Sequence, residues 1–175
     1  MKSSFKVNFI INKIRDKNII ALPTDTIFGL SSLPTMALTD KLSTLKNRNK
    51  NKGFILLTSN LIYLDKYIDE KYLKMLETEY KNIDIATTFI VPSSHFLATN
   101  GTIAVRLTGD SLIKNICNKL KSAIISTSCN ISGNKNIKTL LKLRLFFGND
   151  ISAIAPRENN TQSKIINLLT KEVLR

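Results

Sequence analysis

The chain has 175 residues, of which 43% are hydrophobic and 22% are charged, so it suits one folded domain and is too apolar for a disordered tail. Its formal net charge of +13 and its pI near 9.9 favour anionic partners such as nucleotides, nucleic acid or an acidic membrane surface. One histidine and two cysteines are too few for the roughly four ligands of a structural zinc site, and no apolar run approaches the roughly 18 residues of a membrane span.

Helical and strand patterns alternate along the chain, which predicts an α/β domain with a largely buried sheet. In chain order, the spacing predicts a helix at 3–17, a strand at 19–22, a helix at 35–45, a strand at 53–57, a helix in one or two pieces at 61–80, strands at 85–91 and 102–107, a helix at 111–120, a strand at 123–125, a helix at 137–147 and a strand at 151–155. Residues 163–175 fit either a helix or a hairpin. Because no linker or repeat interrupts the pattern, residues 1–175 are predicted to form a single domain.

Three polar side chains, Thr24, Asp25 and Thr26, directly follow the first predicted strand. The carboxyl end of a strand in an open α/β sheet is a common place for a ligand, and threonine hydroxyls can donate or accept hydrogen bonds. A plain turn held by an Asx-type bond from Asp25 explains the same residues. The pattern by itself slightly favours the turn and leaves the ligand site open.

A basic segment joins the second predicted helix to the second predicted strand. Five cations and no acid lie between Lys41 and Lys52, and Gly53 allows the backbone to approach a ligand closely. A triphosphate or an RNA backbone fits such a segment, whereas a solvated basic loop is the usual explanation of a charge run.

Arg106 stands in an apolar, β-rich stretch. Strand alternation places Arg106 on the same face as Thr102 and Ala104. An arginine on a buried strand needs an anionic partner. That partner is either a ligand carboxylate or phosphate, or an acid of the protein such as Asp25, and the sequence supports the two equally.

Small polar side chains crowd the segment that follows the predicted strand at 123–125. They are Ser126, Thr127, Ser128, Asn130 and Ser132, and Gly133 comes next. Hydroxyl groups beside a glycine can cradle an anion or a ribose. A serine-rich turn is the alternative, but turns seldom need so many hydroxyls in succession.

Nucleophilic catalysis has little support in this sequence. His95 falls in a predicted surface loop, and Cys117 has the spacing of a core residue, so a Cys-His pair is not expected. Neither a Gly-x-Ser-x-Gly elbow nor a Walker loop is present. The candidate residues are cations and hydroxyls, which suit charge stabilisation of a phosphate-containing reaction. With no signal peptide pattern and no disulfide framework, the expected location is the cytoplasm.

Four of these segments, in this order, resemble the YrdC/TsaC family of threonylcarbamoyl-AMP synthases. The matching strings are Pro23-Thr-Asp-Thr-Ile-Phe-Gly-Leu30, Leu45-Lys-Asn-Arg48 with Lys52-Gly53, Thr102-Ile-Ala-Val-Arg106 and Ser126-Thr-Ser-Cys-Asn-Ile-Ser-Gly133. Each string is weak by itself, but four in register with natural spacing form a specific signal. The chain looks like the short bacterial form, without an appended domain.

The resemblance implies a YrdC-like α/β fold, with a twisted mixed sheet and helices around a basic cavity. Such proteins form threonylcarbamoyl-AMP from L-threonine, bicarbonate and ATP and release pyrophosphate, as nucleotidyltransferases of tRNA threonylcarbamoyladenosine modification. The implied partners are those three substrates and the tRNA-modifying proteins that accept the adenylate, with possible RNA contact and no membrane. Mg²⁺ is expected to accompany ATP, without a dedicated set of protein ligands.

The resemblance also implies roles for individual residues. The catalytic pair would be Lys46 and Arg48. Contacts to ATP are implied for Arg48, Lys52, Thr102, Ser128, Asn130 and Arg175. Contacts to threonine are implied for Thr26, Arg106, Ser126 and Ser163, with Arg106 on the threonine carboxylate.

The sequence departs from the family pattern in two places. A Pro-Gly-Pro-x-Thr turn is usual before the strand that ends at Pro92, but this chain has Asp84-Ile-Ala-Thr-Thr88 there. A glycine-rich loop is usual before the C-terminal segment, but this chain has Pro156-Arg-Glu-Asn-Asn160. The loop shapes at these two places are therefore expected to differ.

Two other functions agree with parts of the sequence. A non-catalytic RNA-binding module agrees with the basic charge, but such folds usually expose aromatic platforms, and Phe5, Phe9 and Phe89 have core-like spacings. A carbamoyl-adenylate-forming domain like that of hydrogenase-maturation proteins usually needs acyl-phosphatase and zinc-finger partners in the same chain, and neither is present.

Overall fold

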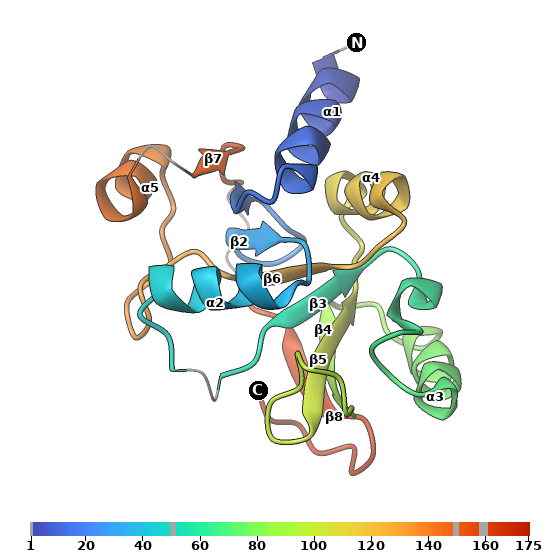
Figure 1. Cartoon of the computed structure of the whole chain (residues 1–175). Coiled ribbons are helices and arrows are strands. Elements are labelled where there is room, and N and C mark those ends of the chain that lie inside the picture. The colour runs from blue at the N-terminus through green and yellow to red at the C-terminus, as the bar shows by residue number, and fades with distance from the viewer. Residues whose placement is uncertain (1, 50–51, 149–150, 158–160) are drawn as a thin grey trace.

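The computed structural model describes residues 2–49, 52–148, 151–157 and 161–175. Within these residues the chain order is α1 (Lys2–Arg15), β1 (Ile20–Leu22), β2 (Gly29–Ser32), α2 (Met36–Leu45), β3 (Ile55–Thr58), the 3₁₀ helix η1 (Leu61–Leu64), α3 (Glu70–Tyr80), β4 (Thr87–Pro92), β5 (Thr102–Leu107), α4 (Ser111–Leu120), β6 (Ile124–Ser128), α5 (Leu140–Phe147), β7 (Ser152–Ala153) and β8 (Lys164–Asn167). The predicted alternation of helices and strands is confirmed (Figure 1).

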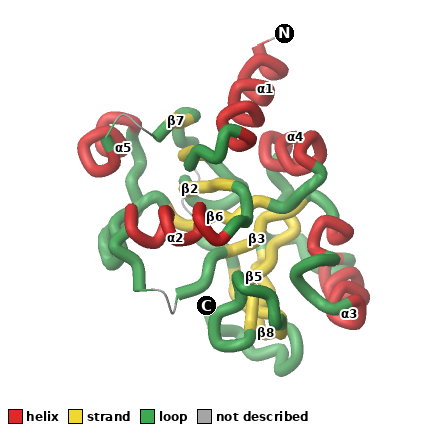
Figure 2. Tube along the Cα trace, viewed as in Figure 1, coloured by secondary structure: helices red, strands yellow, loops and turns green. Residues whose placement is uncertain are grey.

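One mixed sheet holds all eight described strands, in the order β7-β1-β2-β6-β3-β5-β4-β8. The pairs β1–β7, β3–β5 and β4–β8 are parallel, and the other four are antiparallel. Figure 2 shows the strands as a central layer with helices around it. The predicted twisted mixed sheet is therefore present.

Two hydrophobic clusters cover the two faces of the sheet, and the alternation of β1 shows how they divide. Ile20 and Leu22 belong to the cluster that α1 and α4 cover, while Ala21 belongs to the larger cluster under α2, α3 and α5. Because successive side chains of a strand point to opposite faces, an apolar run of three residues contributes to both clusters. No helix within the described ranges is long and apolar enough to cross a membrane.

The aromatic residues of α1 do not lie where their spacing predicted. Phe5 is 78% exposed and Phe9 is 40% exposed, whereas Ile10 and Ile14 are fully buried. The branched residues of α1 form the stripe that packs against α4, and the phenylalanines fall outside that stripe. The prediction that Phe5 and Phe9 are core residues was wrong, and Phe89 is buried as predicted.

Three differences between the predicted and the observed strands and helices have a local cause. Strand β2 was not predicted, because Gly29–Ser32 offers a single large apolar residue. Ser126–Ser128 continues strand β6 instead of forming a turn. Helix α5 begins at Leu140, after the Thr139 side chain accepts a hydrogen bond from the Lys142 amide. At 61–80 the sequence left one or two helical pieces open, and the structure has two, η1 and α3.

The C-terminal segment, for which the sequence left two alternatives, is a hairpin. The Ile165 amide donates to the Arg175 carbonyl at 2.8 Å, and the Leu174 amide donates to the Ile165 carbonyl at 2.8 Å. β8 itself pairs with β4, so this hairpin closes one edge of the sheet and returns Arg175 towards the middle of the molecule.

Strands β2 and β6 approach each other closely at Gly29. A Cβ atom at this position would lie 2.9 Å from Ser126 Oγ and 3.0 Å from the Thr127 carbonyl oxygen. The backbone of β6 cannot move aside as a flexible side chain can, because it also pairs with β3. Glycine at position 29 is therefore required by the spacing of the two strands.

We predict that Gly29→Ala lowers the free energy of unfolding by about 1–3 kcal/mol, because it overpacks the β2–β6 pair. Urea unfolding followed by circular dichroism measures this change. Gly109→Ala is the matched control, since a Cβ atom at Gly109 meets nothing within 4 Å. Equal unfolding midpoints for the two variants would contradict the prediction.

Candidate functional site

Two adjoining cavities lie where β5, β6 and the C-terminal hairpin meet. The larger has a volume of about 410 Å³ and the smaller about 40 Å³. Both cavities are lined by Ile27, Ile55, Ser126, Thr127, Ser128 and Arg175. Because they share these walls, ligands in the two cavities would be neighbours.

Strand β5 supplies one wall through the alternation that the sequence predicted. Thr102 and Ala104 line the larger cavity, and Arg106, on the same face, lines the smaller one. Ile103 and Val105 point the other way into the core. The prediction that Thr102, Ala104 and Arg106 share a face is confirmed.

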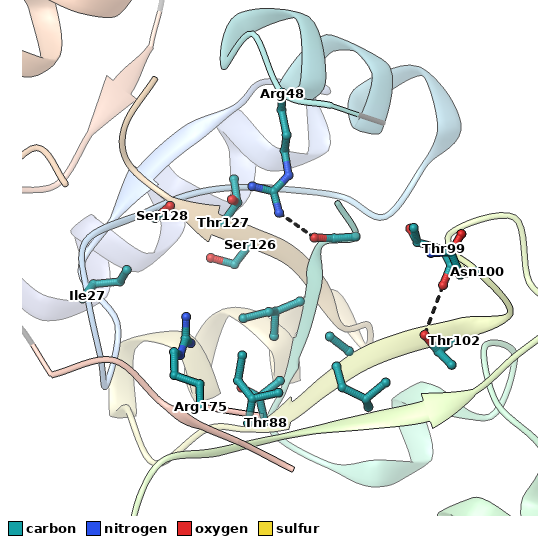
Figure 3. A pocket seen from close by; sticks show the side chains of 15 residues that line it. Ile27, Arg48, Thr88, Thr99, Asn100, Thr102, Ser126, Thr127, Ser128 and Arg175 are labelled. Carbon is teal, nitrogen blue, oxygen red and sulfur yellow. Dashed lines mark hydrogen bonds between the residues drawn. The ribbon is translucent and has the colours of Figure 1, made fainter. Parts of the chain in front are cut away.

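Arg48 enters the larger cavity from the segment after α2. Its Nε donates to the Lys52 carbonyl at 3.0 Å, and its Nη2 donates to the Gly53 carbonyl at 2.8 Å. The guanidinium also lies over the Phe54 ring, 5.3 Å from the ring centroid. These contacts fix a half-buried cation at the cavity wall (Figure 3).

Arg175 reaches the same space from the C-terminal hairpin, and Figure 3 shows Arg48 and Arg175 directed into the cavity from opposite sides, with Ser126 between them. The Arg175 side chain donates to the Ser163 carbonyl at 3.3 Å and to Ser163 Oγ at 3.4 Å. Ser163 Oγ in turn lies 2.9 Å from Thr88 Oγ1 on β4. Arg175 is thereby tied to the sheet.

The smaller cavity is built around Arg106, which is 4% exposed. Arg106 Nη2 lies 3.1 Å from Asp25 Oδ1, so the ion pair that the sequence suggested is confirmed. Burial lowers the pKa of Arg106, and the carboxylate of Asp25 opposes that shift. Nε of Arg106 is buried and finds no hydrogen-bond acceptor among the residues that the structure describes.

The turn after β1 contains two hydrogen bonds of Thr24 Oγ1. Thr24 Oγ1 accepts from the Thr26 amide at 3.1 Å and donates to the Ile27 carbonyl at 2.9 Å. Thr26 Oγ1 lies 3.1 Å from Thr24 Oγ1, and both threonines line the smaller cavity. A turn is therefore present, and the side chains of two of its residues, Thr24 and Thr26, also face a cavity.

Lys46 has a different environment from the other cations. Its side chain is fully buried, and its ammonium donates to the Ser128 carbonyl, to the Asn130 carbonyl at 2.6 Å and to Asn130 Oδ1 at 2.9 Å. Burial lowers its pKa to about 8, and the nearby positive charge of Arg48 adds to that effect. Lys46 thus holds the segment from Ser128 to Asn130 in place.

Most of the residues that the resemblance implied come together here. The larger cavity is lined by Arg48, Thr102, Ser126, Ser128 and Arg175, and the smaller one by Thr26, Arg106, Ser126 and Ser163. Lys46, Lys52 and Asn130 line neither cavity. The Lys52 side chain is exposed, and the Asn130 side chain is bonded to Lys46, Ser128 and Asn134.

Thr88 is a lining residue that was not predicted. It occupies the threonine position of the Pro-Gly-Pro-x-Thr pattern, so the pattern itself was the signal that could have identified it. The second departure from the family pattern is the segment that begins at Pro156, where the Arg157 guanidinium forms an ion pair with Asp110. Residues 158–160 of that segment, and Lys50 of the basic segment, lie outside the described residues.

The cavities offer cations and hydroxyl groups. Among their described lining residues none is a carboxylate, and the described chain brings together no group of three His, Cys, Asp or Glu side chains for a metal ion. Mg²⁺ often binds through substrate phosphates and water with few protein ligands, so this donor set fits an ion that arrives with a nucleotide. A phosphate-rich ligand suits the larger cavity, and a small carboxylate suits the smaller one.

Lys46 allows a pH-dependent test of this arrangement. Its folded-state pKa of about 8 lies below the ordinary 10.5, so between these values the unfolded chain keeps a proton that the folded chain has released. The contribution of Lys46 to the free energy of unfolding is therefore lowest below this window and rises with pH across it.

We predict that the free energy of unfolding of the wild type, minus that of Lys46→Met, increases from about pH 7 to about pH 10. Urea titrations of both proteins at each pH measure it. A difference that stays constant would show that the buried ammonium keeps an ordinary pKa.

Comparison with known proteins places these features in a family. The Sua5/YciO/YrdC family model, described as "Telomere recombination", matches residues 12–175. Several proteins named threonylcarbamoyl-AMP synthase are similar in sequence to this chain. The one from Histophilus somni is 32% identical over 95% of this chain and 96% of its own, and the one from Buchnera aphidicola of Schizaphis graminum is 34% identical over 94% and 92%.

Solved structures have the same fold. A variant of P. abyssi Sua5 superposes with a TM-score of 0.80 at 20% identity, over 98% of this chain and 56% of that one, so this chain spans about half of that protein. Another structure of P. abyssi Sua5 is described as complexed with L-threonine. E. coli YciO superposes with a TM-score of 0.76 at 17% identity, over 97% of this chain and 87% of that one. From the family match and these identities, the chain belongs to the Sua5/YciO/YrdC family.

Proposed function

We propose that this protein is a threonylcarbamoyl-AMP synthase, a nucleotidyltransferase that uses L-threonine, bicarbonate and ATP. The observation that carries the proposal is the pair of adjoining cavities, with Arg48 and Arg175 in the larger one and Arg106 in the smaller one. The names of the relatives and the threonine complex of P. abyssi Sua5 support it.

The residues suggest how each substrate would bind. The guanidinium of Arg106 would take the threonine carboxylate, with the hydroxyls of Thr26 and Ser126 beside it. The triphosphate would occupy the larger cavity between Arg48 and Arg175, near the hydroxyls of Thr102 and Ser128. The shared wall would then bring the amino acid next to the α-phosphate.

The chemistry needs positioning and charge stabilisation more than a nucleophile. The threonine nitrogen bonds to the carbon of bicarbonate with loss of water, and a carbamate oxygen then attacks the α-phosphorus while the bond to the pyrophosphate oxygen breaks. Two anions approach each other in this step, so cations beside the phosphates lower the barrier. Mg²⁺, when bound with ATP, would supply further neutralisation of the phosphate charge.

Lys46 enters this proposal as a positioning residue, although the resemblance implied a catalytic role. Its ammonium is satisfied by carbonyl and amide oxygens of Ser128 and Asn130 and lines neither cavity. Ser128 does line both cavities. Lys46 would therefore act by fixing the wall that carries Ser128. Contact with RNA, and with proteins that accept the adenylate, remains a prediction.

The test of this function is pyrophosphate release by the pure protein with ATP, bicarbonate, Mg²⁺ and threonine. Release should require threonine and bicarbonate together, and isotope-labelled threonine should appear in an adenylate product detected by mass spectrometry. Serine should work less well. No threonine-dependent release, together with binding of RNA, would support the non-catalytic module instead.

We predict that Arg48→Ala lowers kcat/KM for pyrophosphate release by about 10²-fold, about 3 kcal/mol of transition-state stabilisation, because a cation at the phosphates is lost. Arg48→Lys should recover part of the activity, since it keeps the charge but loses the planar fork. Lys142→Ala, at an exposed lysine of α5, is the matched control and should stay within about twofold of the wild type. Equal losses in Arg48→Ala and Lys142→Ala would contradict a specific role.

A further inference from the structure

Asp25 lies behind Arg106, on the side away from the smaller cavity. Arg106 lines that cavity, whereas Asp25 lines a separate groove with Thr108, Gly109 and Lys114. The guanidinium of Arg106 therefore stands between a protein carboxylate and the space where a ligand carboxylate would bind. Its 3.1 Å contact with Asp25 uses one edge of the guanidinium, Nη2.

The Asp25 carboxylate is itself fixed by the loop between β5 and α4. Thr108 Oγ1 donates to Asp25 Oδ2 at 3.1 Å, and the Gly109 amide donates to the same oxygen at 3.2 Å. Thr108 Oγ1 also accepts from the Asp110 amide at 3.1 Å, and the Asp110 side chain caps α4 by accepting from the Ile113 amide. A series of hydrogen bonds thus connects the start of α4 to Asp25, and the ion pair connects Asp25 to Arg106.

The geometry points to Asp25 as a positioning residue that orients the Arg106 guanidinium towards the amino-acid carboxylate, and to Thr108 as the group that fixes Asp25. This inference rests on the proposed function. A guanidinium binds a carboxylate best when its planar fork faces both oxygens. If Asp25 holds the Arg106 guanidinium in this orientation before the ligand binds, the Arg106 side chain loses less conformational freedom on binding, which favours binding.

Removal of Asp25 would have two opposite effects on threonine binding, one through the orientation of Arg106 and one through charge. Removing the Asp25 charge leaves the positive charge of Arg106 uncompensated, which by itself would strengthen the attraction for a ligand carboxylate. Thr108→Val separates the two effects, because it keeps both charges and removes the hydroxyl that fixes Asp25. Thr108→Ser is its matched control, because serine keeps that hydroxyl.

The experiment measures the KM values for threonine and for ATP separately in the pyrophosphate assay. We expect the threonine KM to rise about tenfold in Asp25→Asn, which loses the ion pair that orients Arg106 directly, and about threefold in Thr108→Val, which loses one of the two hydrogen bonds from the β5–α4 loop to Asp25 Oδ2. The ATP KM should stay within about twofold in both, and Thr108→Ser should match the wild type. If Asp25→Asn does not fold, the Thr108 pair decides the question.

Two results would overturn the inference. An unchanged or lower threonine KM in Thr108→Val would show that Asp25 does not orient Arg106, and equal increases in both KM values would show that the loop is only structural. Failure of the proposed function is distinguishable, because the wild type itself would then release no pyrophosphate. Threonine affinity measured by calorimetry on the same variants would in that case decide on Asp25, and a wild type that binds no threonine would overturn this inference as well.

Discussion

A buried guanidinium on a central strand is the feature around which this site is organised. Arg106 is 4% exposed on β5, and a charge in such a place is costly unless an opposite charge accompanies it. Asp25 supplies that charge from the turn after β1. The pair joins two segments that are far apart in the sequence, and it leaves Arg106 on the wall of a cavity small enough for an amino-acid carboxylate.

Strand alternation carries this constraint to the rest of the site. Because Ile103 and Val105 fill the core, Thr102 and Ala104 must share the cavity face with Arg106. β6 pairs with β3 and brings Ser126 and Ser128 to the wall of the larger cavity. The fold thereby joins a place for a phosphate chain to a place for a small acid.

Local pattern predicted much of this structure, because most elements bury residues in regular alternation. The shared face of β5 was expected from spacing. The two-piece helix at 61–80 and the ion pair of Arg106 were each one of two alternatives that spacing and charge left open. The resemblance then brought together residues such as Thr26 and Arg175, which no local pattern relates. These parts of the site could be predicted because a short string of residues is enough to identify each of them.

Features that depend on partners far away in the sequence could not be predicted in this way. Lys46 looks like one more solvated cation of a basic segment, yet carbonyl oxygens of Ser128 and Asn130 make it a buried residue. β2 has one large apolar side chain and forms because β1 and β6 flank it. Phe5 and Phe9 have helical spacing, but the packing of α1 on α4 leaves them exposed.

The most direct test of the account is a crystal structure of the protein with L-threonine and α,β-methylene-ATP, an analogue whose α–β bridge resists cleavage. The account predicts the threonine carboxylate on the Arg106 guanidinium and the triphosphate between Arg48 and Arg175, with the amino acid beside the α-phosphate. A nucleotide bound on another face, or threonine bound away from Arg106, would contradict it.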